Sequence, residues 1–257
     1  MANTAPIELV VVPCLSDNYA FLVHNAATGQ TALIDAPEAQ PISDALAARG
    51  WTLSDILITH HHDDHIDGVA ALRAGARVIG AKADAHRLPP LDLEVAEGDA
   101  IMVCGQPAHV IDVSGHTNGH SAYHMPDAGY AFTADSLMAL GCGRLFEGTP
   151  ARMWESMQKL RALPDNTIIC SGHEYTTANA RFAVSLDPGN SDLMSRVEGI
   201  RTARAAGQPT VPSTLIEEMR TNPFLRADIP EFKKVLGMAD ASDVDVFAAV
   251  RARKDKF

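Results

Sequence analysis

The first two thirds of the chain alternate between short apolar runs and polar stretches, a pattern typical of mixed strands and helices. Three apolar runs near the start predict strands, at Ile7–Val12, Tyr19–His24 and Thr31–Asp35. The segment Ile42–Arg49 predicts a helix, and Gly50 after it suits a helix C-terminal cap. Strand-forming and helix-forming segments then alternate as far as His173. This pattern predicts an α/β domain.

The pattern changes after about Tyr175, where helix-favouring segments replace the β-prone runs. Four later segments favour helix: Asp192–Ala206, Thr214–Arg220, Pro230–Leu236 and Asp243–Lys256. Thr214 and Glu217 have the spacing of a capping box at the start of one of them. We therefore expect residues 1–175 to form the α/β domain and residues 176–257 to form a small helical domain.

Composition describes an ordinary globular protein and excludes some partners. The chain has 257 residues, of which 46% are hydrophobic and 21% are charged, enough to bury a sizeable core. Its formal net charge of −11 argues against a nucleic-acid partner or an anionic membrane surface, because both demand a basic footprint. No uninterrupted apolar stretch approaches membrane-spanning length.

The cysteines and the N-terminal residues bear on the compartment. Residues Met1–Pro6 have neither the basic start nor the apolar region of a secretory signal. The four cysteines are widely spaced and form no C-x-x-C pair: Cys14, Cys104, Cys142 and Cys170. We therefore expect reduced thiols and a cytoplasmic location. A catalytic cysteine is the disfavoured alternative, because none stands in a nucleophile motif.

The most informative polar cluster is Thr59–His65, which follows the apolar run Ile56–Ile58. Four residues with strong metal-ligand chemistry fall within six positions: His60, His62, Asp64 and His65. Such a cluster after a predicted buried strand is typical of a metal site. The alternative is a solvated polar loop that happens to be rich in histidine.

The spacing within this cluster favours two metal ions over one. In an extended chain His60 and His62 share a face and can converge on one ion. The adjacent Asp64 and His65 cannot both keep that alternation. The backbone must therefore turn near Asp64, into a helix that we expect over Ile66–Arg73, and the second pair is aimed at a different point.

Three further segments repeat the pattern of a β-prone run that ends in a potential ligand: Val110–His116, Tyr130–Asp135 and Thr167–His173. Strand ends are where α/β folds place their chemistry. Adding His116, Asp135 and His173 gives seven candidate ligands, too many for one tetrahedral zinc. If one carboxylate bridges two ions ~3.5–4 Å apart, each ion has four protein ligands and room remains for a shared water.

The order His-x-His-x-Asp-His, then His, Asp and His, resembles the metallo-β-lactamase superfamily, and within it glyoxalase II, the hydroxyacylglutathione hydrolases. The resemblance covers essentially the whole chain. Further matching motifs are Ser16–Tyr19, Ser114–Thr117, Gly172–Thr176, Asp187–Asn190, Asn222–Arg226 and Arg251–Lys254. The last three lie outside the superfamily's common core and make the assignment specific. The resemblance implies an αββα sandwich with a small C-terminal all-α domain.

The resemblance also implies roles for the seven candidates. His60, His62 and His116 would bind the first metal, and Asp64, His65 and His173 the second. Asp135 would bridge the two ions. Asp64 and Asp135 are the expected catalytic residues. A hydroxide shared by the ions would be the nucleophile. Zinc is the expected metal, and iron and manganese suit the same ligands.

Substrate selection is expected from the helical domain. Arg251 and Lys254 match the family's glutathione-binding pair, although a basic helix end alone is usually a solvated terminus. Arg144 stands where the family often has a lysine, and Tyr175 matches its tyrosine ligand. Phe146 departs from the family, because relatives carry a tyrosine whose hydroxyl helps to hold glutathione.

We therefore expect a monomeric thioester hydrolase that converts S-D-lactoylglutathione to D-lactate and glutathione, the second step of methylglyoxal detoxification. A thioester suits the site, because its thiolate leaving group needs no strong general acid. The alternatives are a persulfide dioxygenase-like enzyme with one iron and a non-catalytic metal-binding or ligand-binding member of the fold. A nuclease of this fold is disfavoured by the charge.

Among the remaining histidines, His61 lies between two candidate ligands, and strand alternation points it away from them. We expect it to lie on the surface or to support a ligand from behind. His120 resembles a recurring superfamily position and is expected to be structural.

Overall fold

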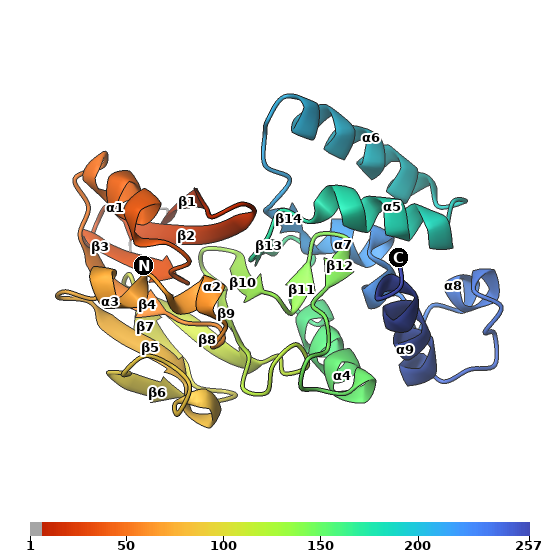
Figure 1. Cartoon of the computed structure of the whole chain (residues 1–257), viewed down its shortest axis with the longest axis horizontal. Helices are drawn as coiled ribbons and strands as arrows, with labels where there is room; N and C mark the ends of the chain where they lie inside the picture. Colours follow the sequence, from red (N-terminus) through yellow and green to blue (C-terminus); the bar gives the residue numbers. More distant parts are fainter. Residues whose placement is uncertain (1–6) are drawn as a thin grey trace. The chain divides into compact units, whose positions relative to one another are not determined.

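The structure, a computed structural model, describes residues 7–257 and divides into two compact units (Figure 1). The first unit takes the described part of Met1–Asp112 together with Gly119–Phe132, and the second takes Val113–Asn118 and Thr133–Phe257. Met1–Pro6, on which the expectation about a secretory signal rests, lie outside the described residues.

The first unit contains a six-stranded mixed sheet in the order β1-β2-β3-β4-β5-β6. Its strands are β1 (Ile7–Cys14), β2 (Asn18–Asn25), β3 (Gln30–Ile34), β4 (Leu53–Leu57), β5 (Arg77–Ala81) and β6 (Leu93–Val95). The β1-β2-β3 pairs are antiparallel, and the pairs from β3 to β6 are parallel. The three strands predicted near the start of the chain are confirmed.

The same unit carries four antiparallel strands of a second sheet, in the order β10-β9-β8-β7. They are β7 (Ala100–Val103), β8 (Gln106–Asp112), β9 (Ser121–Met125) and β10 (Tyr130–Ala134), of which the last two residues fall in the second unit. Phe21 of β2 and Phe132 of β10 place their ring centroids 5.8 Å apart. The side chains between these sheets therefore form one layer of core.

The other face of the first sheet packs on α1 (Ala39–Ala47) and α3 (Val69–Leu72). Ala20 and Leu22 of β2 share a buried cluster with Ile42 and Leu46 of α1. All eight residues of β2 are buried, since both faces of the strand are covered. A strand buried on both faces is a continuous apolar run rather than an alternating one.

Two helix predictions in this unit need correction. Helix α1 begins three residues before the predicted Ile42, because Pro41 is compatible with the first helical turn. It ends at Ala47, and Gly50 has the positive φ of +66° expected after a helix C-terminus. The prediction of one helix over Ile66–Arg73 is wrong, since two short helices, α2 (Asp63–Ile66) and α3, occupy that region.

The break between α2 and α3 has a tertiary cause. Gly68 lies at the break and donates its backbone N–H to the carbonyl of Ala36 at 2.8 Å. A Cβ at Gly68 would lie 2.9 Å from that carbonyl oxygen, so only glycine allows the approach. The carbonyl of His65 accepts from the N–H of Ala36 at 2.8 Å. These contacts fix the helix that carries Asp64 and His65 against the end of β3.

The second unit is mainly helical. Its elements are β11 (Leu137–Met138), β12 (Gly141–Cys142), α4 (Pro150–Arg161), β13 (Ile168–Ser171), α5 (Thr176–Leu186), α6 (Ser191–Ala205), β14 (Ser213–Thr214), α7 (Leu215–Thr221), α8 (Pro230–Val235) and α9 (Asp243–Lys254). A short 3-10 turn of this unit lies at Pro223–Leu225, and another, Lys82–Asp84, belongs to the first unit. The four predicted C-terminal helices are present with bounds shifted by one or two residues, whereas α5 was not predicted.

The cap of α7 follows its sequence signature only in part. The hydroxyl of Thr214 accepts from the backbone N–H of Glu217 at 3.4 Å, as a capping box requires. The Glu217 carboxylate contacts Arg196, with 3.6 Å between Oε1 and Nε.

In the core of this unit, Phe224 stacks with Phe182, and Phe247 meets the edge of Phe224. None of the helices in the described part of the chain has the length and apolar character needed to cross a bilayer.

Candidate metal centre

The first group of predicted ligands lies where the chain leaves β4. His60 is fully buried, and its Nε2 lies 3.1 Å from Nδ1 of His62. The Nδ1 of His60 lies 3.0 Å from the hydroxyl of Thr59. The apolar strand end is packed in the core and fixes this loop. Two imidazole nitrogens therefore converge from one short segment, as the spacing predicted.

A buried carboxylate that the sequence analysis did not select, Asp35, organises this group. It follows β3 directly, is 2% exposed and adopts a positive φ of +55°. Asp35 accepts hydrogen bonds of 2.8 Å from the backbone N–H and the hydroxyl of Thr59, and Nδ1 of His65 lies 2.8 Å from its Oδ2. With Nδ1 donating to Asp35, His65 would bind a metal through Nε2.

Asp35, His60 and His65 offer donor atoms that all lie within 4.8 Å of one another. The signal that identifies Asp35 is the same one that identified the other candidates: a β-prone run, Thr31–Asp35, that ends in a carboxylate.

Asp64 is held by Asn18 of β2. The side-chain amide of Asn18 donates at 3.0 Å to both the carbonyl and the carboxylate of Asp64. Oδ2 of Asp64 lies 3.9 Å from Nε2 of His65. Asn18 belongs to the motif Ser16–Tyr19, so part of that motif supports a predicted ligand.

The two neighbouring histidines have other contacts. His61 places Nδ1 at 2.8 Å from the buried carboxylate of Asp84, which also pairs with Arg87. His61 therefore turns to a different group from His60 and His62, as strand alternation predicted. The ring of His120 stacks on the ring of His60 with centroids 4.6 Å apart.

The second group of predicted ligands is assembled from three separate segments. The Oδ2 atom of Asp135 lies 3.5 Å from Nε2 of His116 and 3.3 Å from Nε2 of His173. The three side chains are all buried, between 4% and 6% exposed. Nδ1 of His116 lies 2.8 Å from the carbonyl of Arg144, which fixes the ring and leaves Nε2 facing Asp135.

Close backbone approach holds this second group together. A Cβ on Gly143 would lie 2.0 Å from the carbonyl oxygen of Asp135 and 2.8 Å from Nδ1 of His116. No residue larger than glycine can therefore occupy position 143 without moving both ligands. The N–H of Gly172 donates to the carbonyl of Ala134 at 3.1 Å, which ties the segment of His173 to that of Asp135.

The residues expected to bind substrate divide into exposed and buried side chains. Arg144 is exposed, and its guanidinium lies 5.9 Å from the ring centroid of Phe146. Phe146 is 60% exposed and meets His116 edge-on at 5.3 Å. Tyr175 is 41% exposed and stacks on His173 at 4.6 Å. Two aromatic rings thus flank two of the predicted ligands within the second unit.

The two basic side chains of α9, Arg251 and Lys254, are less exposed to solvent than their place at a basic helix end suggests. Arg251 is only 7% exposed, and it donates to the carbonyl of Cys142 at 2.9 Å and to Asp255 at 3.0 Å. The Lys254 ammonium is half-buried, 3.4 Å from the carbonyl of Ala178. Burial lowers the pKa of Lys254, and the nearby cations Arg251 and Arg181 lower it further.

All four thiols are free and buried. Burial raises the pKa of Cys142 to about 11, against the opposing effect of Arg251. Burial likewise raises the pKa of Cys14 to about 11 and that of Cys104 to about 12. The pKa of Cys170 is raised as well. Burial therefore disfavours the thiolate form of all four cysteines.

Each group of predicted ligands suits a divalent metal ion by its chemistry. Imidazoles and carboxylates are the ligand types of zinc, iron and manganese sites. His65 and His116 each hold Nδ1 against an acceptor, the arrangement that metal-bound histidines adopt.

Comparisons with known proteins agree with this chemistry. Residues 16–173 match the model of the metallo-beta-lactamase superfamily, and residues 174–257 match the hydroxyacylglutathione hydrolase C-terminus. A hydroxyacylglutathione hydrolase of Cereibacter sphaeroides (strain ATCC 17025 / ATH 2.4.3) is 63% identical over 254 residues, which is 98% of this chain and 100% of the relative. One from Jannaschia sp. (strain CCS1) is 63% identical over 252 residues, covering 97% of this chain and 98% of the relative.

Among solved structures, the BLEG-1 B3 metallo-beta-lactamase superposes with a TM-score of 0.66 at 20% identity, covering 85% of this chain and 99% of that one. This likeness shows the metallo-beta-lactamase fold. The chain belongs to the hydroxyacylglutathione hydrolase (glyoxalase II) family of the metallo-beta-lactamase superfamily.

Proposed function

We propose that the protein hydrolyses S-D-lactoylglutathione, and related 2-hydroxyacyl glutathione thioesters, to the free acid and glutathione. The product from the first substrate is D-lactate, and the reaction is the second step of methylglyoxal detoxification. The observation that carries this proposal is the 63% identity, over 254 residues, to a relative that bears the name of the activity. The buried imidazole and carboxylate groups of both units support it.

The proposed cofactors are two divalent metal ions, with zinc as the first choice and iron or manganese as alternatives. His60, His62 and His116 would hold one ion, Asp64, His65 and His173 would hold the other, and Asp135 would bridge them. Two such ions supply an activated water near neutral pH and neutralise negative charge that develops on the carbonyl oxygen. The contact distances of Asp135 to His116 and His173 support its bridging role.

The protein's own groups orient the ligands in this proposal. Asp35 holds the ring of His65, and the carbonyl of Arg144 holds the ring of His116. Asn18 steadies Asp64. Because the leaving group is a thiolate, whose conjugate acid has a low pKa, these residues need only position the reacting groups, and no strong general acid is required.

The second unit offers groups for the glutathione carrier, which has two carboxylates and one ammonium. Arg144 and Lys254 are the proposed carboxylate partners, since both ammonium and guanidinium groups are at least partly exposed. Tyr175 and Phe146 provide exposed aromatic surface beside His173 and His116. Arg251 retains a place in the proposed substrate-binding set, but its donors already bind Cys142 and Asp255. Its contribution is therefore expected to be indirect.

The proposed domain boundary follows the sequence, with residues 1–175 catalytic and residues 176–257 helical and glutathione-binding. We also propose a monomer in the cytoplasm, without nucleic-acid or membrane partners. The buried free thiols agree with a reducing compartment. A persulfide dioxygenase-like enzyme with a single iron remains the second enzymatic candidate.

The test is hydrolysis by metal-loaded protein of D-lactate thioesters of glutathione and of a thiol that lacks the glutathione carboxylates. We expect rapid turnover of the glutathione thioester and a much higher KM for the other carrier. Equal kcat/KM for both carriers would contradict glutathione recognition. Oxygen consumption with glutathione persulfide, in the absence of thioester turnover, would favour the dioxygenase.

A further inference from the structure

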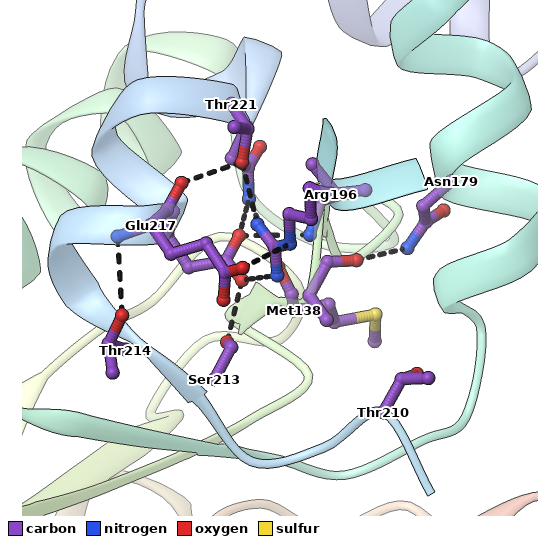
Figure 2. A network of polar contacts seen from close by, with 12 residues as sticks. Met138, Asn179, Arg196, Thr210, Ser213, Thr214, Glu217 and Thr221 are labelled. Atoms are coloured by element: carbon purple, nitrogen blue, oxygen red, sulfur yellow. Dashed lines mark hydrogen bonds and ion pairs between the residues drawn. The ribbon is translucent and has the colours of Figure 1, made fainter. Parts of the chain in front are cut away.

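A buried carboxylate outside the candidate metal centre, Glu218 of α7, is the centre of a polar network in the second unit. Figure 2 shows this network from close by, with Arg196, Ser213 and Thr221 labelled. Glu218 is 0% exposed. Its Oε1 accepts from the hydroxyl of Ser213 at 2.6 Å and from the guanidinium of Arg196. Arg196 is itself buried and also donates to the hydroxyl of Thr221 at 2.7 Å, a contact visible in Figure 2.

The other oxygen of Glu218 is directed to a backbone turn. Oε2 accepts from the N–H of Leu140 at 2.9 Å and lies 3.0 Å from the side-chain amide nitrogen of Asn222. A fully buried carboxylate is costly unless it is paired and hydrogen-bonded. The two oxygens of Glu218 receive four contacts, so the side chain has little freedom and neither do the groups that it holds.

The turn that Glu218 holds joins the two strands of the β11–β12 hairpin. Leu140 adopts a positive φ of +55°, an unfavourable backbone conformation for a leucine. Two asparagine side chains, one in α5 and one directly after α7, support the surrounding carbonyls. Asn222 Nδ2 lies 3.0 Å from the carbonyls of Met138 and Gly141. Asn179 donates to the carbonyl of Ala139 at 3.0 Å. External hydrogen bonds therefore stabilise a turn that is strained by itself.

The two ends of this hairpin contact the predicted metal ligands. Strand β11 begins two residues after Asp135, and β12 ends immediately before Gly143. Gly143 donates to the carbonyl of Ser136 at 3.2 Å and packs against Asp135 and His116 so closely that a Cβ cannot be placed there. The next residue, Arg144, supplies the carbonyl that orients His116.

We propose that Glu218 is a positioning residue for the Asp135–His116 pair: by holding the hairpin turn at Leu140 it fixes Gly143 and Arg144 against the two ligands. Arg196 acts through Glu218, because its buried guanidinium donates to Oε1 of this carboxylate. The proposal rests on the proposed metal role of Asp135 and His116. It assigns the helices of the C-terminal region a task in ligand geometry that is separate from substrate binding.

The test compares Glu218→Gln with a matched control, Asp187→Asn. Asp187 is 7% exposed and pairs with Arg226 at 2.7 Å, so it also belongs to a buried ion pair of the second unit, but none of its contacts reaches the hairpin. Glutamine has the same size as Glu218, but it replaces one carboxylate oxygen by an NH₂ group. This NH₂ group must face either the hydrogen-bond donors at Oε1 or those at Oε2, and the hydrogen bonds on that side are lost. The measurements are Zn²⁺ affinity by competition with a chromophoric chelator, the melting temperature, and kcat and KM.

We expect Glu218→Gln to bind at least one Zn²⁺ about 10–100-fold more weakly than the unmodified protein, with a lower kcat and a nearly unchanged KM. Asp187→Asn should lose melting temperature and retain Zn²⁺ affinity. Unchanged affinity in folded Glu218→Gln would overturn the proposal, and so would an equal loss of affinity in Asp187→Asn. Absence of Zn²⁺ binding by the unmodified protein would instead overturn the proposed function.

A second variant decides the outcome if Glu218→Gln does not fold. Asn179→Ala removes one hydrogen bond to the turn and no charge, so the fold should survive. We expect a loss of Zn²⁺ affinity of roughly threefold, on the order of one neutral hydrogen bond. Asn179→Ala with unmodified affinity would count against the proposal.

Discussion

The two groups of metal-binding candidates are built in opposite ways. In the first unit His60, His62, Asp64 and His65 lie within six consecutive positions, and a strand end with a short helix aims them. In the second unit His116, Asp135 and His173 come from three segments separated by 19 and 38 residues. The first group, the local cluster, is formed by one short segment of sequence. The second group, the dispersed group, is brought together only by tertiary packing.

The difference extends to the groups that support the ligands. Asp35 supports the local cluster through one fully buried carboxylate with three contacts of 2.8 Å. The dispersed group relies on backbone: the Arg144 carbonyl, the close approach of Gly143, and the hairpin that Glu218 holds. A dispersed group therefore needs helices outside its own segments, and distant substitutions should affect it more.

The largest expected effect comes from the centre of the dispersed group. Asp135→Ala should lower metal content and reduce activity by more than about 100-fold, beyond the range for residues that only support ligands. The reason is that Asp135 contacts both His116 and His173. Metal analysis per chain checks this. Asp127→Ala, an exposed carboxylate in a turn, is the control and should keep its metal. A full metal content in Asp135→Ala would contradict the proposal that Asp135 bridges two ions.

The supporting carboxylate of the local cluster should have the next largest effect. Asp35→Asn should weaken metal binding by about 10–100-fold, because the amide cannot accept from Thr59 and His65 as a carboxylate does. Asparagine tolerates the positive φ at this position, so the backbone is not strained. The control is Asp55→Asn, a buried carboxylate paired with Arg77 at 2.7 Å, which should change stability and leave metal affinity intact.

Substitution of Lys254 is expected to have a smaller effect, on substrate binding rather than on metal binding. Lys254→Ala should raise KM about fivefold with kcat unchanged, since a partly exposed ion pair contributes about 1 kcal/mol. Lys254→Arg should largely restore KM. If Lys254→Ala kept the KM of the unmodified protein at moderate salt, this lysine would not contact the carrier.

The pH dependence of KM follows from the same lysine. Burial lowers the pKa of Lys254, so its positive charge is lost at a lower pH than in an ordinary lysine. The charged form is the one that binds a carboxylate, and KM should therefore rise with pH as that charge is lost. The folded state also disfavours the charged form of Lys254, which lowers the free energy of unfolding while the lysine is charged. The free energy of unfolding should therefore increase as rising pH removes this charge. Lys254→Arg should show no corresponding rise in KM.

The smallest expected effect is a gain. Phe146→Tyr adds one hydroxyl beside His116, and a hydrogen bond to the carrier would be worth about 0.5 kcal/mol at so exposed a position, or roughly a twofold lower KM. Phe146 is 60% exposed, so the added oxygen remains in water and the melting temperature should not fall. An unchanged KM would show that position 146 does not touch the carrier.

How far the sequence predicts each part depends on the range of the interactions. The local cluster could be recognised because its ligands share one segment. Helix α5 and the break at Gly68 were missed because they depend on packing and on a backbone hydrogen bond to Ala36. Two buried charges resemble surface charges in the sequence, Glu218 beside Glu217 and Arg251 at a basic helix end. Only their tertiary partners distinguish them.

We propose that the two groups of ligands together hold two metal ions and that thioester hydrolysis needs both ions. The most direct test titrates metal-free protein with Zn²⁺ while bound metal per chain and hydrolysis of S-D-lactoylglutathione are followed together. We expect full activity only when two ions are bound per chain. Full activity at a single ion, or no thioester hydrolysis with two ions bound, would contradict a two-metal thioester hydrolase.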